Sequence, residues 1–109
     1  MKYHNKKIVI DNIKFDSKKE GNRYIQLKLL EKAGLIKDLE LQPAFLLQPS
    51  FKKNGKTNRK IEYIADFKYY DIESKKWIVE DAKGFKTDVY KLKKKLFEYK
   101  YEDLEIKEI

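Results

Sequence analysis

Two acids and a lysine follow closely on two apolar runs that are predicted to be neighbouring strands. Asp66 comes directly after the run at residues 63–65, and Asp81 and Lys83 close the run that begins at Trp77. Side chains alternate between the two faces of a strand, so Asp81 and Lys83 are expected to point the same way. A carboxylate and an ammonium on an otherwise apolar strand are costly unless they pair, bind a metal or do chemistry. The end of the second strand is therefore a candidate site.

The chemistry that fits these residues is metal-assisted. Carboxylate oxygens of Asp66 and Asp81 on adjacent strands can converge on one hard cation such as Mg2+, which prefers oxygen ligands and keeps several waters. Such an ion polarises a phosphoryl oxygen and lowers the pKa of a bound water, and Lys83 can orient that water or help to deprotonate it. The residues thus predict a site for phosphodiester hydrolysis, with Mn2+ as a substitute ion.

A helix is expected to begin after Ser17 and to end near Ala33, with Gly34 as its stop. Ser17 and Glu20 have the spacing of a capping box, in which the serine caps the helix and the glutamate reaches back to it. Glu20 also shares a helix face with Tyr24, and that face must pack on the sheet. Two roles for Glu20 therefore stay open, a structural cap and a group that supports the metal or its water.

The remaining elements follow from hydrophobic periodicity and turn residues. In chain order they are a peripheral hairpin within residues 1–15, a helix over 17–33, a half-exposed strand or extended connection over 35–41, a strand over 44–51, a basic hairpin tip over 52–60, a long central strand over 61–70, a strand over 77–83, a helix over 87–99 and a last strand over 101–109. The chain is expected to be a single domain, with residues 16–109 as its core.

An ordered set of motifs resembles the PD-(D/E)XK nuclease superfamily. The set is the helix start at residues 17–24, then Asp66, then Asp81-x-Lys83, and it covers residues 15–109. The spacing is similar to small phage-encoded members, to transposon end-cleaving subunits and to Holliday-junction resolvases. The resemblance implies an α/β fold with a mixed sheet and a restriction-endonuclease-like αβββαβ core. It also implies a Mg2+-dependent DNA endonuclease of phage or mobile-element recombination or processing.

The resemblance assigns roles to individual residues. Asp66 and Asp81 would ligate the metal, and the carbonyl of Ala82 would add a further oxygen. Lys83 would position or activate the attacking water, and Glu20 would support a second metal or that water. These are the candidate catalytic and metal-binding residues.

The sequence departs from the superfamily pattern at two positions. Ala65 stands where a proline usually precedes the first acid, and that proline does no chemistry. Asp81 stands where glutamate is more frequent, and Glu80 beside it leaves the second ligand open, because a β-bulge could turn Glu80 towards the metal. Asp81 is favoured because it shares its strand face with Lys83.

The composition limits the possible chemistry. The chain has 109 residues, of which 41% are hydrophobic and 14% aromatic, enough for one modest core. With no cysteine and one histidine, disulfides, thiolate zinc sites, cysteine nucleophiles and Ser-His-Asp catalysis are excluded within one chain. A long apolar run and a signal peptide are both missing from the sequence, so a soluble, cytoplasmic protein is expected.

The charge favours a polyanionic partner. The chain has 26 Lys and Arg against 18 Asp and Glu, a net charge of +8, and lysines that neutralise phosphates release counterions. Solubility alone is the competing explanation for the charge, and a solvated turn is the competing explanation for the basic hairpin tip. The candidate DNA contacts are Lys53, Lys56 and Arg59 in that tip and Lys91, Lys94 and Lys95 in the second helix.

DNA is expected to be recognised by its structure, because the sequence offers no recognition helix with an Arg, Asn or Gln pattern. A homodimer is what the resemblance implies, since two strand cuts need two sites. The rival hypothesis is a non-catalytic DNA-binding module of a recombination or packaging complex. A third is a structural or inhibitor protein whose Asp and Lys simply pair.

Overall fold

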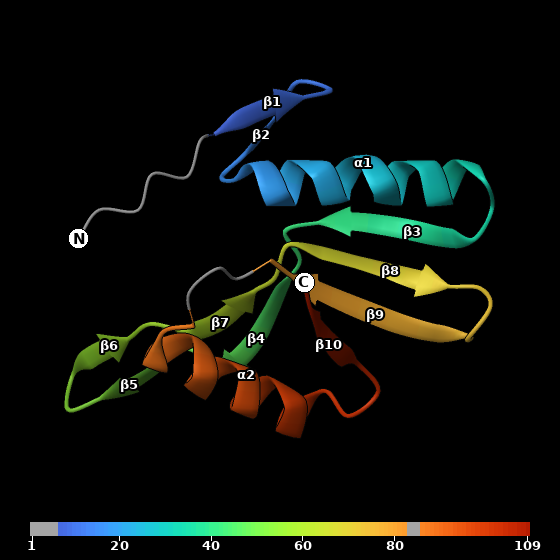
Figure 1. Cartoon of the computed structure of the whole chain (residues 1–109). Coiled ribbons are helices and arrows are strands. Elements are labelled where there is room, and N and C mark those ends of the chain that lie inside the picture. Colours follow the sequence, from blue (N-terminus) through green and yellow to red (C-terminus); the bar gives the residue numbers. More distant parts are fainter. Residues whose placement is uncertain (1–6, 83–85) are drawn as a thin grey trace.

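The structure is a computed structural model that describes residues 7–82 and 86–109 (Figure 1). The described residues form two helices and ten strands. The elements are β1 (Ile8–Ile10), β2 (Ile13–Phe15), α1 (Lys18–Lys32), β3 (Ile36–Leu41), β4 (Ala44–Gln48), β5 (Phe51–Lys53), β6 (Lys56–Asn58), β7 (Ile61–Ile64), β8 (Phe67–Asp71), β9 (Lys76–Asp81), α2 (Asp88–Lys100) and β10 (Glu105–Glu108). Lys83, predicted to act at the site, lies outside the described residues.

A four-stranded sheet in the order β10-β9-β8-β3 forms the centre of the fold. Its strands β3, β8 and β9 are antiparallel, whereas β10 runs parallel to β9. Helix α1 lies along β3 (Figure 1). With the β4 to β7 segment set aside, the order is α1, β3, β8, β9, α2, β10. Two helices and sheets of mixed strand orientation thus confirm the predicted mixed-sheet α/β class. Among the described residues, seven strands lie between α1 and α2, where the predicted core order has three.

The predicted long strand over residues 61–70 is wrong. It is broken at Asp66 into β7 and β8, which pair with different strands: β7 with β4, and β8 with β3 and β9. The break is fixed by backbone hydrogen bonds. The N–H of Ala65 donates to the carbonyl of Pro43 at 3.1 Å, and the N–H of Asp66 donates to the carbonyl of Glu80 at 3.0 Å. Asp66 therefore sits at a junction between two sheets, not inside a strand.

The predicted strand over residues 44–51 is also shorter than expected. It ends at Gln48, and the chain resumes as β5 after Pro49, because proline cannot donate a ladder hydrogen bond. β4 pairs with β7 outside the main sheet, and residues 35–41, left open as a strand or a connection, supply the sheet strand β3.

Both helices begin at the residues that the sequence indicates. The Ser17 hydroxyl accepts a hydrogen bond from the N–H of Glu20 at 3.1 Å, and the Thr87 hydroxyl accepts one from the N–H of Tyr90 at 3.1 Å. Beyond α1, Gly34 has a φ of +78°, a left-handed conformation that glycine adopts without strain. The predicted helix start and stop are therefore confirmed.

Two hydrophobic clusters lie on either side of β9. The cluster under α1 contains Phe15, Tyr24, Leu27, Ile36, Phe67 and Tyr69. The cluster under α2 contains Phe45, Tyr63, Ala65, Val79, Tyr90 and Phe97. Because side chains of β9 alternate between them, the acids at the end of this strand are enclosed on both sides. Glu80 and Asp81 are both fully buried.

The N-terminal hairpin packs on the first turn of α1. Its turn residues Asp11 and Asn12 have φ values of 52° and 63°, the positive values that a two-residue hairpin turn of this kind requires. Gly21 lies beneath the hairpin, and a Cβ added there would lie 2.3 Å from Cδ1 of Ile8. The glycine is therefore required by the close approach of β1, which the sequence alone does not explain.

Within residues 7–82 and 86–109, helices with both the length and the apolar character needed to cross a membrane are absent.

Candidate metal site

The carboxylate of Asp66 is held against the end of β9. Its Oδ2 accepts a hydrogen bond from the backbone N–H of Ala82 at 2.6 Å, while its own backbone N–H donates to the carbonyl of Glu80. Both contacts exist because the chain breaks between β7 and β8 at this residue. The break thus fixes the first acid beside the segment that carries the second.

Asp81 is the second acid, and its side chain is fully buried on the α2 side of the sheet. The Tyr63 hydroxyl, from β7, donates to Oδ2 of Asp81 at 2.5 Å. Burial raises the pKa of Tyr63, and its bond to the Asp81 carboxylate raises it further. Tyr63 therefore stays a hydrogen-bond donor and orients the carboxylate of Asp81.

Glu20 approaches the same place from α1. It is 6% exposed and, with Asp66, lines a pocket of about 130 Å³ next to β2. Burial raises the pKa of Glu20 to about 7, helped by the charges of Asp66, Asp16 and Asp81 and opposed by a hydrogen bond to the Asp16 backbone. Glu20 therefore faces the acids, as its place on the buried stripe of α1 predicts, and it also lies in the first turn that Ser17 caps.

These acids are neighbours but are not gathered around a single point. Among the described residues, no group of three or more His, Cys, Asp or Glu side chains lies close enough together to hold one metal ion. Mg2+ sites commonly use one or two carboxylates and complete the shell with water. The donor set of Asp66 and Asp81 fits that chemistry, with Glu20 near enough to sense both charges.

Glu80, the alternative second ligand, faces α1 and is bound there. Nε and Nη2 of Arg23 donate to its Oε1 and Oε2 at 2.7 and 2.6 Å, and the Tyr69 hydroxyl also donates to Oε2. β8 and β9 pair residue by residue from Asp71–Lys76 to Phe67–Glu80 without a shift in register. The bulge that would turn Glu80 towards the metal is therefore not present in this pairing. Both oxygens of Glu80 are engaged, which leaves Asp81 as the better candidate.

Sequence reasoning missed the residues that hold the buried acids. Arg23 lies one helical turn after Glu20, so its place on the sheet-facing side of α1 was a usable signal for a partner of Glu80. Tyr63 and Tyr69 gave no comparable signal, because aromatic residues in strands usually fill the core. Their hydroxyls find acids only because strands distant in sequence pair here.

The predicted DNA contacts lie on two elements. Lys53, Lys56 and Arg59 are exposed around the β5–β6 hairpin, which projects beyond β4 and β7 (Figure 1). Its turn at Asn54 and Gly55 has φ values of 53° and 75°.

On α2, Lys91 and Lys95 are exposed, whereas Lys94 is half-buried and 3.7 Å from a carboxylate oxygen of Glu108. Lys94 is therefore the least available of the predicted contacts.

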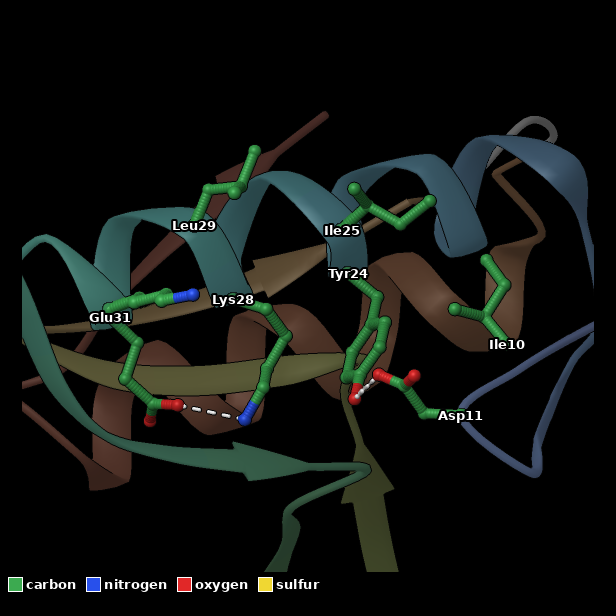
Figure 2. A pocket seen from close by; sticks show the side chains of 8 residues that line it. Ile10, Asp11, Tyr24, Ile25, Lys28, Leu29 and Glu31 are labelled. Atoms are coloured by element: carbon green, nitrogen blue, oxygen red, sulfur yellow. Dashed lines mark hydrogen bonds and ion pairs between the residues drawn. The ribbon is translucent and has the colours of Figure 1, made fainter.

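A larger hollow, of about 500 Å³, lies between α1 and the turn of the β1–β2 hairpin (Figure 2). The Tyr24 hydroxyl donates to Oδ2 of Asp11 inside it at 2.8 Å, and Lys28 pairs with Glu31 at 2.9 Å. The candidate acids do not line it, so it is separate from the site.

Residues 1–109 match the family described as DUF1064, a protein family of unknown function, and the chain belongs to that family. Comparison with curated proteins and with solved structures gave no match in either set.

Proposed function

We propose that the protein is a Mg2+-dependent DNA endonuclease. The observation that carries this proposal is the junction at Asp66, which fixes one carboxylate against the end of β9 beside the buried Asp81. Glu20 reaches the same place from a separate helix. Three acids brought near one another from separate parts of the chain, two of them buried, favour a cation site over a purely structural role, because a bound cation would offset the repulsion between their charges.

In this proposal Asp66 and Asp81 hold the ion, with the Ala82 carbonyl as a further oxygen and Mn2+ as a substitute. Bound there, Mg2+ supplies Lewis acidity to the scissile phosphate and makes water more acidic. Lys83 orients the attacking water or takes its proton. Glu20, which is buried near both acids, would support that water or a second ion.

The element order around the main sheet also supports the proposal, since it matches the αβββαβ order of the nuclease superfamily that the motifs resemble. The proposed substrate is DNA recognised by structure, in phage or mobile-element recombination or processing in the cytoplasm. Lys53, Lys56 and Arg59 would contact phosphates, together with Lys91 and Lys95 of α2, because all five are exposed. A homodimer would place two sites on the two strands.

Cleavage assays test the activity. The purified chain is incubated with supercoiled plasmid and, separately, with a labelled four-way junction, each with Mg2+, Mn2+ or EDTA. Asp66→Asn, Asp81→Asn and Lys83→Ala are expected to lose at least 100-fold in rate, whereas Asp103→Asn, an exposed residue between α2 and β10, retains wild-type activity. Cuts confined to the junction would identify a resolvase.

Thermal unfolding distinguishes the rival functions. Millimolar Mg2+ is expected to raise the Tm of the wild type but not of Asp66→Asn, because only a folded site binds the ion. DNA binding without cleavage, unchanged by the site variants and by EDTA, would overturn the nuclease proposal in favour of a non-catalytic DNA-binding module. If the chain shows no DNA binding and its Tm does not depend on metal, both DNA functions are ruled out and a structural or inhibitor protein is the remaining hypothesis.

A further inference from the structure

Helix α2 carries an apolar stripe on the side that faces solvent. Val89, Leu92, Leu96 and Tyr99 are 62%, 58%, 41% and 85% exposed. Their spacing of three, four and three residues is that of an a/d seam, which places them on one face of a helix. The buried residues Tyr90 and Phe97 lie on the opposite face, against β4 and β7. The stripe is therefore not part of the core of this chain.

The apolar surface continues beyond the helix. Val89 and Ile64 line a shared hollow of about 290 Å³ between α2 and β7, and Ile64 is itself 55% exposed. Contiguous apolar residues on a surface rich in charge are typical of an interaction site.

Lysines border the stripe on both sides. At 100° per residue, Lys91 and Lys95 fall on one flank and Lys93 on the other. Lys100 lies on the same flank as Lys93, but its Nζ donates to the carbonyl of Leu46 at 2.9 Å.

Three acids lie near these flanks: Asp88 at the start of the helix, Glu98 about 20° from Lys91 around the helix, and Glu62 of β7. Glu62 lines the same hollow as Lys93 but is 3.5 Å from Lys60. An apolar seam between basic flanks selects its occupant by charge as well as by hydrophobicity, because flanking charges set partner choice between paired helices.

The flanking charges oppose a second copy of this chain as that occupant. In an antiparallel pair of α2 helices, Lys95 meets the other Lys95 and Lys93 meets the other Lys93. In a parallel pair, Lys95 meets Lys100, and only Asp88 finds a lysine. DNA would satisfy the lysines but would leave the leucine seam uncovered, since phosphates offer no apolar surface.

We propose that this face of α2 binds an acidic amphipathic helix of another protein, whose apolar seam covers Val89, Leu92, Leu96 and Tyr99 and whose Asp or Glu residues pair with the flanking lysines. The proposal rests on the exposed seam and its charges and is independent of nuclease activity. Such a partner would compete with DNA for Lys91 and Lys95, so it would also weaken any DNA contact made by α2.

Two labelled model peptides test the proposal by fluorescence anisotropy with the whole chain. Both have leucine at a and d over three heptads, and one has glutamate and the other lysine at e and g. The glutamate peptide is expected to bind at least tenfold more tightly. Leu92→Ser/Leu96→Ser should lower its affinity at least tenfold, whereas Ile25→Ser/Leu29→Ser should change it less than twofold.

The control pair is closely matched, because Ile25 and Leu29 are 43% and 63% exposed on α1, where Lys28 is paired with Glu31. Circular dichroism checks that both double variants remain folded. Equal binding of the two peptides, or equal loss in both variants, would overturn the proposal. If the chain self-associates in sedimentation and Leu92→Ser/Leu96→Ser abolishes that association, the proposal is overturned in favour of a second copy of the chain. If Leu92→Ser/Leu96→Ser, and not the control variant, loses affinity for DNA, the proposal is overturned in favour of DNA.

Discussion

Glu20 is an acid whose proton affinity is set by its neighbours. Its pKa is about 7 in the folded chain against an ordinary 4.5, so between these pH values the folded protein keeps a proton that the unfolded chain has lost. The free energy of unfolding therefore falls as the pH rises from about 4.5 to 7, and the full penalty is present above that range.

Replacing Glu20 with Gln removes this penalty. In metal-free buffer we expect the variant to be more stable than wild type by roughly 1–2 kcal/mol at pH 8, with the difference shrinking towards pH 5. Urea unfolding at four pH values measures it, with the exposed Glu102→Gln as the control. A difference that does not change with pH would contradict the electrostatic explanation.

Arg23 and Glu80 form an ion pair that joins α1 to β9, in which Glu80 is fully buried and the Arg23 side chain is 21% exposed. Removing the guanidinium in Arg23→Ala leaves the fully buried Glu80 without its cation, although the Tyr69 hydroxyl still donates to it. We therefore expect a loss of about 3 kcal/mol in unfolding free energy. Arg23→Lys should recover only part of it, because a lysine cannot bind both carboxylate oxygens in the same way.

Two further variants serve as comparisons for Arg23→Ala. Lys28→Ala breaks an exposed pair with Glu31 and should cost less than about 0.5 kcal/mol. The double replacement Arg23→Met/Glu80→Leu should be more stable than Arg23→Ala, because it removes the buried charge of Glu80 together with that of its partner. If Arg23→Ala costs no more than Lys28→Ala in urea unfolding, the pair does not hold the two elements together.

At the scale of elements, the N-terminal hairpin and α1 are fitted to each other at Gly21. Alanine favours a helix over glycine by about 1 kcal/mol, but its Cβ would meet Cδ1 of Ile8 at 2.3 Å. We expect Gly21→Ala to destabilise the wild type by about 1 kcal/mol, because the hairpin must shift.

The same substitution should become stabilising where the hairpin leaves room. In an Ile8→Ala background, Gly21→Ala is expected to add up to about 1 kcal/mol, so a double-mutant cycle in urea should show coupling between the two sites. The exposed Asn22→Ala tests helix propensity alone. Additive effects of Gly21→Ala and Ile8→Ala would show that β1 does not press on α1.

At the scale of the whole molecule, the net charge of +8 includes exposed lysines on the β5–β6 hairpin and on α2, which are the proposed DNA contacts. The β5–β6 hairpin projects beyond β4 and β7 (Figure 1), and its lysines are exposed. Each lysine that neutralises a phosphate adds about 0.9 to the slope of log K against log salt concentration.

We therefore expect Lys53→Ala/Lys56→Ala to reduce that slope by up to about 2 for any duplex sequence, with binding measured by anisotropy from 50 to 300 mM NaCl. Lys32→Ala/Lys107→Ala removes the same charge elsewhere and should change the slope by less than half as much. Equal changes in the two variants would mean that only the net charge matters.

The sequence by itself determined the helix ends, the hairpin turn and the identity of the candidate residues, but not the limits of the strands at residues 44–51 and 61–70. Caps at Ser17 and Thr87, the Asp11-Asn12 turn and the apolar spacing of both helices depend on neighbouring residues, and the structure agrees with them. Glu80 and Asp81 are neighbours on one strand, so the two-residue repeat of a strand likewise places their side chains on opposite faces of the sheet.

Only the tertiary structure decided how these pieces meet. The break at Asp66 arises because β7 and β8 pair with strands that lie far away in the sequence, and no local pattern records such pairing. The choice of Arg23 for Glu80 and of Tyr63 for Asp81 depends on the same packing. A buried carboxylate must find a donor wherever the fold brings one, so its partner is fixed by the three-dimensional arrangement and not by sequence spacing.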